Sequence, residues 1–173
     1  MAGPRIPDRI RSLTPYKPGR PIEEVERELG IRGSLKIASN ENPLGPSPLA
    51  LAALAAALPG IHRYPDGGAV LLAEKLASRL GVKPAQLVFG NGSNEVLELA
   101  CRLFAGPGDE VLFSANAFLV YPIVATAVGA TVVKAPPRGF EHDLEAFASL
   151  LSPRTRVVFL ANPNNPWTPR SRR

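Results

Sequence analysis

Short apolar runs alternate with helical patterns through the second half of this chain, and this alternation constrains the fold more than any other feature. The expected strands are QLVFG (86–90), the end of GPGDEVLFS (106–114), ATVVKA (130–135) and RVVFLA (156–161). The expected helices span residues 93–105, 118–129 and 142–151. Strands that alternate with helices of about ten residues predict a three-layer α/β/α domain with a mainly parallel sheet.

The first half of the chain is rich in proline and shows helices without strands. Residues 1–47 predict a mostly irregular arm with one polar helix, IEEVERELG, which Gly30 ends. A second helix is expected to follow Ser47, which is placed to cap its exposed amides, and a third is expected to end at Gly81. The sequence therefore predicts an arm over residues 1–47 and an α/β domain over residues 48–166.

The charge and the cysteine content exclude several classes of protein. The formal net charge is +5, but residues 167–173 carry three arginines and no acid, and the rest of the chain holds 17 basic and 15 acidic residues. A nucleic-acid surface is therefore not expected. The single cysteine, Cys101, lies in an apolar helical pattern, which predicts a small buried side chain and no disulfide within the chain. No apolar stretch approaches the ~20 residues of a membrane span, and we expect a cytoplasmic protein.

Parallel sheets of this kind bind ligands at the carboxyl ends of their strands, and three motifs fall there. In VFGNGSNEVLELA, the small-residue loop Gly90-Asn91-Gly92 leads into a helix that begins near Ser93. Glycines let a backbone approach an anion, and the free amides of a helix start bind phosphate. The alternative is an ordinary turn with Ser93 as the helix cap. The loop lacks both the third glycine of a dinucleotide-binding motif and the Lys-Ser/Thr pair of a P-loop.

The other two motifs place an amide and an aromatic ring at strand ends. In NPNNP, prolines fix the backbone around Asn164 and Asn165 and would hold an amide side chain rigidly, although these residues also favour a simple turn. In SANAFLVYPI, Phe118 follows an expected strand and could stack on a flat ring or belong to the core. Each motif therefore has a functional and a purely structural interpretation.

Several stretches occur together in one order: LTPYKPGRPIEEVERELG, KIASNENPLGPSP, HRYPDGG, LVFGNGSNEVLELACRLF, NAFLVYPI and NPNNP. As a set they resemble the first half of the histidinol-phosphate aminotransferase family, over residues 10–166. The resemblance implies the fold of type I pyridoxal-phosphate (PLP) enzymes, incomplete here because the C-terminal half is missing. It also implies PLP as the cofactor of the parent enzyme, a homodimer with shared sites, and amino transfer between histidinol phosphate and 2-oxoglutarate, which yields glutamate.

The resemblance gives roles to matching residues of this sequence. The helix start at Gly92, Ser93 and Asn94 would bind the phosphate of PLP through backbone amides. Phe118 would stack on the pyridine ring, and Asn165 would donate a hydrogen bond to the phenolic oxygen. These implied roles agree with the functional interpretation of the three strand ends.

Residues at the border of the site are also implied. Tyr64 of HRYPDGG would reach the cofactor phosphate of the other subunit, and Tyr16 of LTPY would help to enclose the substrate. Residues 39–42, which end in Asn42, would form a loop near the mouth of the site.

The sequence departs from the family pattern after NPNNP. The pattern continues with Thr-Gly, whereas this chain continues WTPRSRR. We expect residues 167–173 to be a basic tail foreign to the family, from a shifted reading frame or a truncated gene; a native tail is the alternative. The implied Schiff-base lysine, the aspartate for the pyridine nitrogen and an arginine for the phosphate would lie beyond this point. No lysine here matches the family lysine's context, so no catalytic residue is assigned and the chain alone is predicted to be inactive.

The missing half also affects the sheet. In the family the first strand pairs with a strand of the second half, so QLVFG is expected to lack its sheet partner while the other three strands adjoin one another. Other functions stay open at this point. An aromatic aminotransferase or a threonine-phosphate decarboxylase has a similar first half, and a non-catalytic remnant or interaction module would bind a partner and no cofactor. A nucleotide-binding α/β protein is disfavoured by the absent third glycine.

Overall fold

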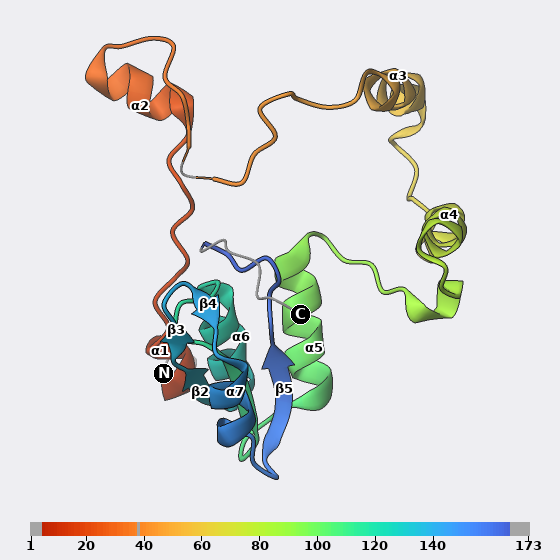
Figure 1. Ribbon diagram of the computed structural model, residues 1–173. Helices are drawn as coiled ribbons and strands as arrows, with labels where there is room; N and C mark the ends of the chain where they lie inside the picture. The colour runs from red at the N-terminus through yellow and green to blue at the C-terminus, as the bar shows by residue number, and fades with distance from the viewer. Residues whose placement is uncertain (1–4, 38, 167–173) are drawn as a thin grey trace. The chain divides into compact units, whose positions relative to one another are not determined.

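The computed structural model describes residues 5–37 and 39–166, and its elements fall into two compact units (Figure 1). The first unit combines the described residues up to Tyr16 with those from Val88 onward, and the second comprises Lys17–Leu87. The chain passes from one unit to the other after Tyr16 and after Leu87, whereas the sequence predicts a boundary after residue 47. The predicted domain limits stay a prediction. The predicted tail, residues 167–173, lies outside the described residues.

A parallel sheet forms the middle layer of the first unit. Its strands, in spatial order, are β2 (Thr131–Ala135), β1 (Glu110–Ser114) and β5 (Thr155–Phe159). The register places Leu112 of β1 between Val133 on one side and Val158 on the other. Every residue of β1 is buried, as expected for a central strand that is covered on both faces. The predicted parallel arrangement of these three strands is confirmed.

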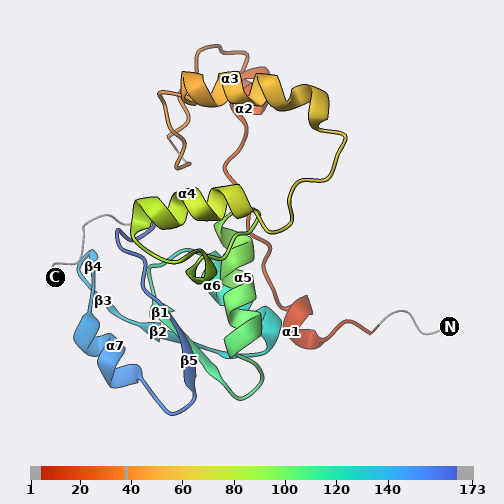
Figure 2. The same cartoon turned by 90° about the vertical axis from the view of Figure 1, so that its right-hand side faces the viewer.

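Helices cover both faces of this sheet and complete three layers (Figures 1 and 2). These helices are α5 (Ser93–Phe104), α6 (Val120–Val128) and α7 (Leu144–Leu150). Because side chains alternate along a strand, Phe113 packs with Cys101 and Tyr121 on the side of α5 and α6. Leu112 packs with Phe147 of α7 on the other side. Cys101 is fully buried, as predicted.

Two short elements escaped the sequence patterns. β3 (Pro137–Arg138) and β4 (Glu141–His142) form an antiparallel hairpin around Gly139, whose φ is +62°. The four-residue helix α1 (Asp8–Arg11) lies against α6. Both elements are too short to show a period of hydrophobic residues, and that period is the signal on which the prediction of helices and strands depends.

The predicted strand at residues 86–90 is wrong. Gln86 ends a short 3-10 helix, η2 (Pro84–Gln86), and residues 87–90 continue as irregular backbone, although Leu87 has extended dihedral angles of −108° and 135°. An extended stretch becomes a strand only when a neighbour completes the ladder of hydrogen bonds, and none of the strands within the described residues pairs with it. Within the described residues this segment therefore has no sheet partner.

We expect the backbone amides of residues 88–90 to exchange with solvent at close to the rates of an unstructured chain, because no ladder protects them. The amides of β1, which is paired on both sides, should exchange at least about a hundredfold more slowly and serve as the internal control. Hydrogen exchange of the 173-residue chain, read by NMR or mass spectrometry, measures both. Slow exchange through residues 88–90 in a sample that elutes as a monomer would contradict this prediction.

The second unit consists of helices and turns. Its elements are α2 (Ile22–Leu29), α3 (Pro48–Ala57), η1 (Leu58–Gly60), α4 (Val70–Leu80) and η2. Gly30 and Gly81 end α2 and α4 in the left-handed conformation, as predicted. α3 begins after Ser47, but the Ser47 side chain makes no capping hydrogen bond, which corrects the prediction. Across both units, the described residues include no helix that is long and apolar enough to cross a membrane.

The buried carboxylate of Glu110 lies at the amino end of β1 and links this strand to the turn before β5. Glu110 accepts hydrogen bonds from Ser152 Oγ at 2.6 Å and from Arg154 Nε and Nη2 at 2.9 and 2.5 Å. Thr155 Oγ1 adds a longer contact of 3.3 Å. The Ser152 hydroxyl, followed by Arg154 and Thr155, lowers the pKa of Glu110 below its ordinary value of 4.5, although burial acts in the opposite direction. The turn between α7 and β5 is thereby fastened to the central strand.

Candidate functional site

Helix α5 begins directly after the loop Gly90-Asn91-Gly92. Gly92 is the N-cap residue, with a φ of +86° that favours glycine, and Ser93 is the first helical residue. The interpretation of Ser93 as the cap is therefore wrong. The first amides of a helix, here those of Ser93 and Asn94, lack partners in a preceding turn, and the helix dipole adds positive potential beside them. This end of α5 is suited to bind an anion such as phosphate.

A carboxylate that the sequence analysis missed holds this loop. Glu95 Oε2 accepts hydrogen bonds from the backbone N of Asn91 at 2.5 Å and from Asn91 Nδ2 at 3.2 Å. A Cβ at Gly90 would lie only 2.9 Å from Glu95 Oε2 and 3.0 Å from Val96 Cγ2, so a side chain at this position would displace the Glu95 carboxylate from the loop. The available signal was an acidic residue in the first turn of the predicted helix, where a side chain can reach back to the preceding loop. Glu95 therefore fixes the shape of the loop from within α5.

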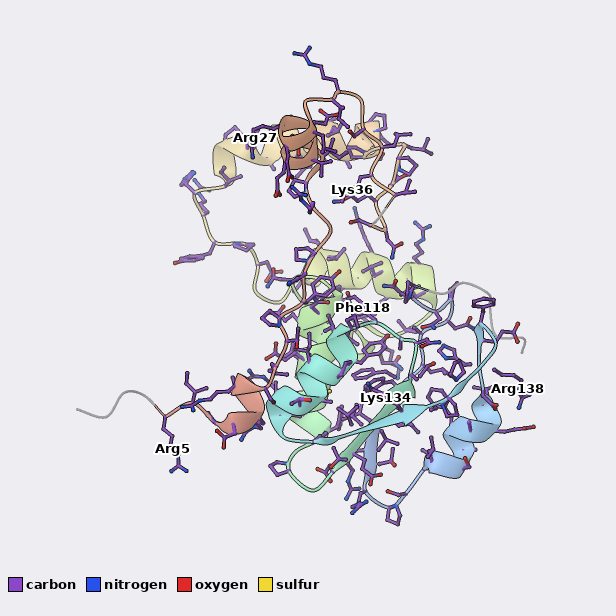
Figure 3. All side chains as sticks on the ribbon, turned by 90° about the vertical axis from the view of Figure 1, so that its left-hand side faces the viewer. Arg5, Arg27, Lys36, Phe118, Lys134 and Arg138 are labelled. Carbon is purple, nitrogen blue, oxygen red and sulfur yellow. The ribbon has the colours of Figure 1, made fainter. Side chains whose placement is uncertain are left out.

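Phe118 follows β1, as the sequence predicts, but it lies in the loop before α6, because the helix expected over residues 118–129 begins only at Val120 (Figure 3). The half-buried ring of Phe118 meets the rings of Tyr16 and Tyr121 edge to face, with centroids 6.1 and 5.9 Å away. Tyr121 in turn stacks on Phe159 at 4.6 Å, and burial raises the pKa of the Tyr121 phenol. The structure thus brings two predicted site residues, Tyr16 and Phe118, together in one aromatic cluster.

The NPNNP segment follows β5 and contains two asparagines in different environments. Asn164 is buried, and its Nδ2 donates a hydrogen bond to the backbone oxygen of Asn116 at 3.0 Å. Asn165 is half-buried, and the peptide bonds before Pro163 and Pro166 are cis. The sequence analysis missed the contact of Asn164, because adjacent asparagines in one motif do not reveal which side chain points inward.

These features lie at one end of the sheet. β1 and β5 run parallel, so the loops that carry Phe118 and Asn165 leave from the same edge, and the hydrogen bond from Asn164 to Asn116 joins the two loops. α5 begins at this end and runs back along the sheet, as Figures 1 and 2 show. The predicted helix start, aromatic ring and strand-end amide therefore gather at one edge of the first unit.

Two predicted site residues belong to the second unit, and their roles stay predictions. Tyr64 is fully exposed. Asn42 uses its carboxamide within its own loop, where Oδ1 accepts a hydrogen bond from the backbone N of Leu44 at 3.1 Å and Nδ2 donates to the backbone oxygen of Gly45 at 2.9 Å. The turn over residues 42–45 thus has a defined local conformation that depends on Asn42.

The lysines are the residues that matter most for covalent chemistry on a carbonyl compound. Lys134 is the only lysine among residues 88–173 of the sequence, and it lies on β2 opposite Phe113 (Figure 3). The other lysines belong to the second unit: Lys17, Lys36, Lys75 and Lys83. In the part of the chain that the structure describes, no cluster of His, Cys, Asp or Glu is arranged to hold a metal ion. The site instead offers backbone amides, an aromatic ring and carboxamides, which are groups suited to binding and orienting a ligand.

Comparison with known proteins shows the family. The family model for aminotransferase class I and II matches residues 32–167. The chain belongs to this family. Curated relatives of this aminotransferase chain include the histidinol-phosphate aminotransferases of Anaeromyxobacter sp. (strain Fw109-5), 55% identical over 164 residues, and Moorella thermoacetica, 48% identical over 163 residues. The matches cover 94% of this chain but 45% and 42% of the relatives, so the chain spans less than half of their length.

Solved aminotransferase structures share the fold. The histidinol-phosphate aminotransferase of Sinorhizobium meliloti, solved in complex with pyridoxal-5'-phosphate, matches with a TM-score of 0.83 and 30% identity, over 95% of this chain and 44% of that one. An aspartate aminotransferase double mutant from Thermus thermophilus matches with a TM-score of 0.73 and 22% identity, over 96% and 46%, and shows the common fold alone. The predicted resemblance and the predicted type I fold, present in part, are confirmed.

Proposed function

We propose that this chain supplies the cofactor-contacting first part of a PLP-dependent aminotransferase that transfers an amino group between histidinol phosphate and 2-oxoglutarate. The observation that carries the proposal is the gathering of a glycine-lined helix start, an aromatic ring and a strand-end carboxamide at one edge of the sheet. The choice of substrate is supported by the histidinol-phosphate aminotransferases that match at 55% and 48% identity.

The helix start fits the phosphate of PLP. A dianion would accept charge-assisted hydrogen bonds from the amides of Ser93 and Asn94, and Gly92, whose own amide donates to the backbone oxygen of Gly90 at 2.9 Å, would line the phosphate site. A Cβ built at Gly92 would meet no atom within 4 Å, so the space beside the helix start is open to a ligand. Glu95 holds the preceding loop through Asn91, which keeps these amides in a fixed arrangement.

The ring and the carboxamide fit the other end of the cofactor. Phe118 would pack against the pyridine ring, with Tyr16 and Tyr121 supporting it at its edges. Asn165 would donate a hydrogen bond to the phenolic oxygen. When bound, PLP supplies the electron sink that amino transfer requires, and the protein residues bind and orient it.

Residues further from the strand ends would complete the site. Tyr16 would help to enclose the substrate, together with the loop that ends in Asn42. The parent enzyme would be a cytoplasmic homodimer, and Tyr64 would reach the cofactor phosphate of the other subunit. The full exposure of Tyr64 supports this role, because its hydroxyl is available to a second chain.

The proposal is tested in a chimaera that joins residues 1–166 to the remaining part of the Anaeromyxobacter relative. Replacement of Phe118 by leucine should weaken PLP binding about 2- to 10-fold, because aromatic packing contributes roughly 0.5–1.5 kcal/mol beyond burial. Absorbance titration with PLP measures the dissociation constant. Phe104→Leu, at an exposed phenylalanine that ends α5, is the matched control and should bind PLP normally. Equal affinities for the two variants would remove Phe118 from the cofactor site.

A further inference from the structure

The loops after β1 and β5 are joined by one buried side chain. Asn164 is 7% exposed, and its Nδ2 donates to the backbone oxygen of Asn116 across 48 positions of sequence. Within the described residues its Oδ1 has no hydrogen-bond partner. A buried carboxamide that satisfies only one of its two ends is costly, so the one hydrogen bond that Asn164 makes must offset this cost.

Both loops have a further anchor besides this bond. In the loop after β5, the backbone oxygen of Ala161 lies 2.7 Å from Nε2 of the buried His142 on β4. In the loop after β1, the backbone N of Ala115 donates to Ala135 on β2 at 2.8 Å. The hydrogen bond of Asn164 therefore links two segments that are each already tied to the sheet or its hairpin.

The link lies next to both residues that are proposed to contact the cofactor ring. Asn165 follows Asn164 directly, and Phe118 lies two positions after Asn116. The backbone oxygen of Phe118 accepts a hydrogen bond from the N of Tyr121 at 3.1 Å, which connects this loop to the start of α6. A change in the spacing of the two loops would thus move Asn165 and Phe118 relative to each other.

We propose that Asn164 is a positioning residue, which sets the spacing between Asn165 and Phe118 through its hydrogen bond to the Asn116 carbonyl. This inference rests on the proposed function, because it takes these two residues as contacts of the PLP ring. The essential property of Asn164 is its N–H donor. A side chain of the same size without a donor would leave the Asn116 carbonyl unpaired and release the two loops from each other.

The competing explanation is that Asn164 only fills space, and two substitutions without charge separate the explanations. Asn164→Leu keeps the size and removes the donor, whereas Asn164→Ser loses size but keeps a donor that can reach the carbonyl directly or through one water. If the donor matters, the serine variant stays closer to the wild type. If volume matters, the leucine variant does. Asn162→Leu, at an exposed asparagine of the same loop, is the matched control.

The test is NMR spectroscopy of the complete 173-residue chain without cofactor. We expect the backbone amide of Phe118, in the other loop, to shift strongly in Asn164→Leu, less in Asn164→Ser and not in Asn162→Leu. In the wild type the side-chain amide protons of Asn164 should exchange about tenfold or more slowly than those of Asn162. This second measurement tests the hydrogen bond of Asn164 in the wild type even where a variant fails to fold.

Any one of three results would overturn the inference. The Phe118 amide signal does not shift in Asn164→Leu, the spectrum of the leucine variant is closer to the wild type than that of the serine variant, or the Asn164 side-chain amide exchanges fast. Addition of PLP to the chimaera, which contains the parts of the cofactor site that the resemblance places beyond residue 166, tests the proposed function separately. If PLP shifts the signals of Ser93, Phe118 and Asn165 there, the link serves the cofactor. If PLP binds the chimaera and shifts none of them while the Asn164 results hold, the link between the loops stands, and its assignment to the cofactor is overturned.

Discussion

The 173-residue chain by itself is expected to give no transamination when it is incubated with PLP, histidinol phosphate and 2-oxoglutarate. Amino transfer through PLP needs a lysine for covalent capture of the cofactor and for proton transfer. The lysine that the family resemblance implies lies beyond residue 166, and Lys134, the one lysine of the sequence between residues 88 and 173, lies along β2 opposite Phe113. Glutamate formation should stay at least about 10³-fold below that of the chimaera, on the scale of positioned acid–base catalysis.

A coupled assay for glutamate measures this difference, and borohydride reduction with PLP followed by peptide mapping locates any covalent adduct. The chimaera that carries Lys134→Gln is the control and should retain the activity of the unmodified chimaera. Turnover by the chain alone, or reduction of PLP onto one defined lysine of residues 1–166, would show that the site is complete without a second part and would contradict the proposal.

Replacement of Ser93 by proline in the chimaera should weaken PLP binding by about one to two decades. Proline suits the first position of a helix, and the ψ of 168° at Gly92 is compatible with a following proline, so α5 should still begin at the same residue. The substitution removes one amide donor to the phosphate, and such a charge-assisted hydrogen bond contributes roughly 1.5–3 kcal/mol. Ser93→Ala, which keeps the amide and removes only the hydroxyl, is the control and should show a smaller loss.

Mixed dimers test whether Tyr64 serves the site of the other subunit. When a Ser93→Pro subunit pairs with a Tyr64→Phe subunit, one site of the dimer carries both changes and the other carries neither, so about half of the activity per dimer should return. The control places both changes on one subunit and pairs it with an unmodified one, which leaves one change in each site and restores no intact site. If the two mixtures behave alike, Tyr64 contributes to neither site, and if the control mixture is the more active one, Tyr64 acts within its own subunit.

The regular elements of the first unit could be predicted because each has its own local period. The apolar runs of β1, β2 and β5 and the helical patterns of α5, α6 and α7 needed no information from elsewhere in the chain. The prediction of a strand over residues 86–90 was wrong for the opposite reason, since strand character there depends on a neighbour that none of the described strands provides. A β-strand requires both an apolar sequence pattern and a neighbouring strand, and only the pattern can be read from the segment itself.

The candidate site was predictable to the level of motifs and less so to the level of atoms. The strand-end positions of Phe118 and Asn165 and the start of α5 follow from the order of strands and helices. The contacts of Asn164 and Glu95 do not, because each depends on which way a side chain turns within a loop of several polar residues. Tertiary neighbours decide that direction, and the sequence around the motif does not contain them.

Glu110 lies at the amino end of β1, whereas the candidate ligand site lies at the carboxyl ends of the strands. The residue that affects stability in acid is therefore separate from the residues proposed to bind the ligand. The lowered pKa of Glu110 means that its carboxylate stabilises the folded state fully above the ordinary value of 4.5, and that this contribution is lost as the pH falls through the lower folded value. Acid therefore loosens the molecule where Ser152 and Arg154 fasten the turn before β5. The amino ends of these strands thus carry the contacts of Glu110 that stabilise the fold, and their carboxyl ends carry the candidate ligand site. Selection or design can therefore alter one end while the chemistry of the other end is kept.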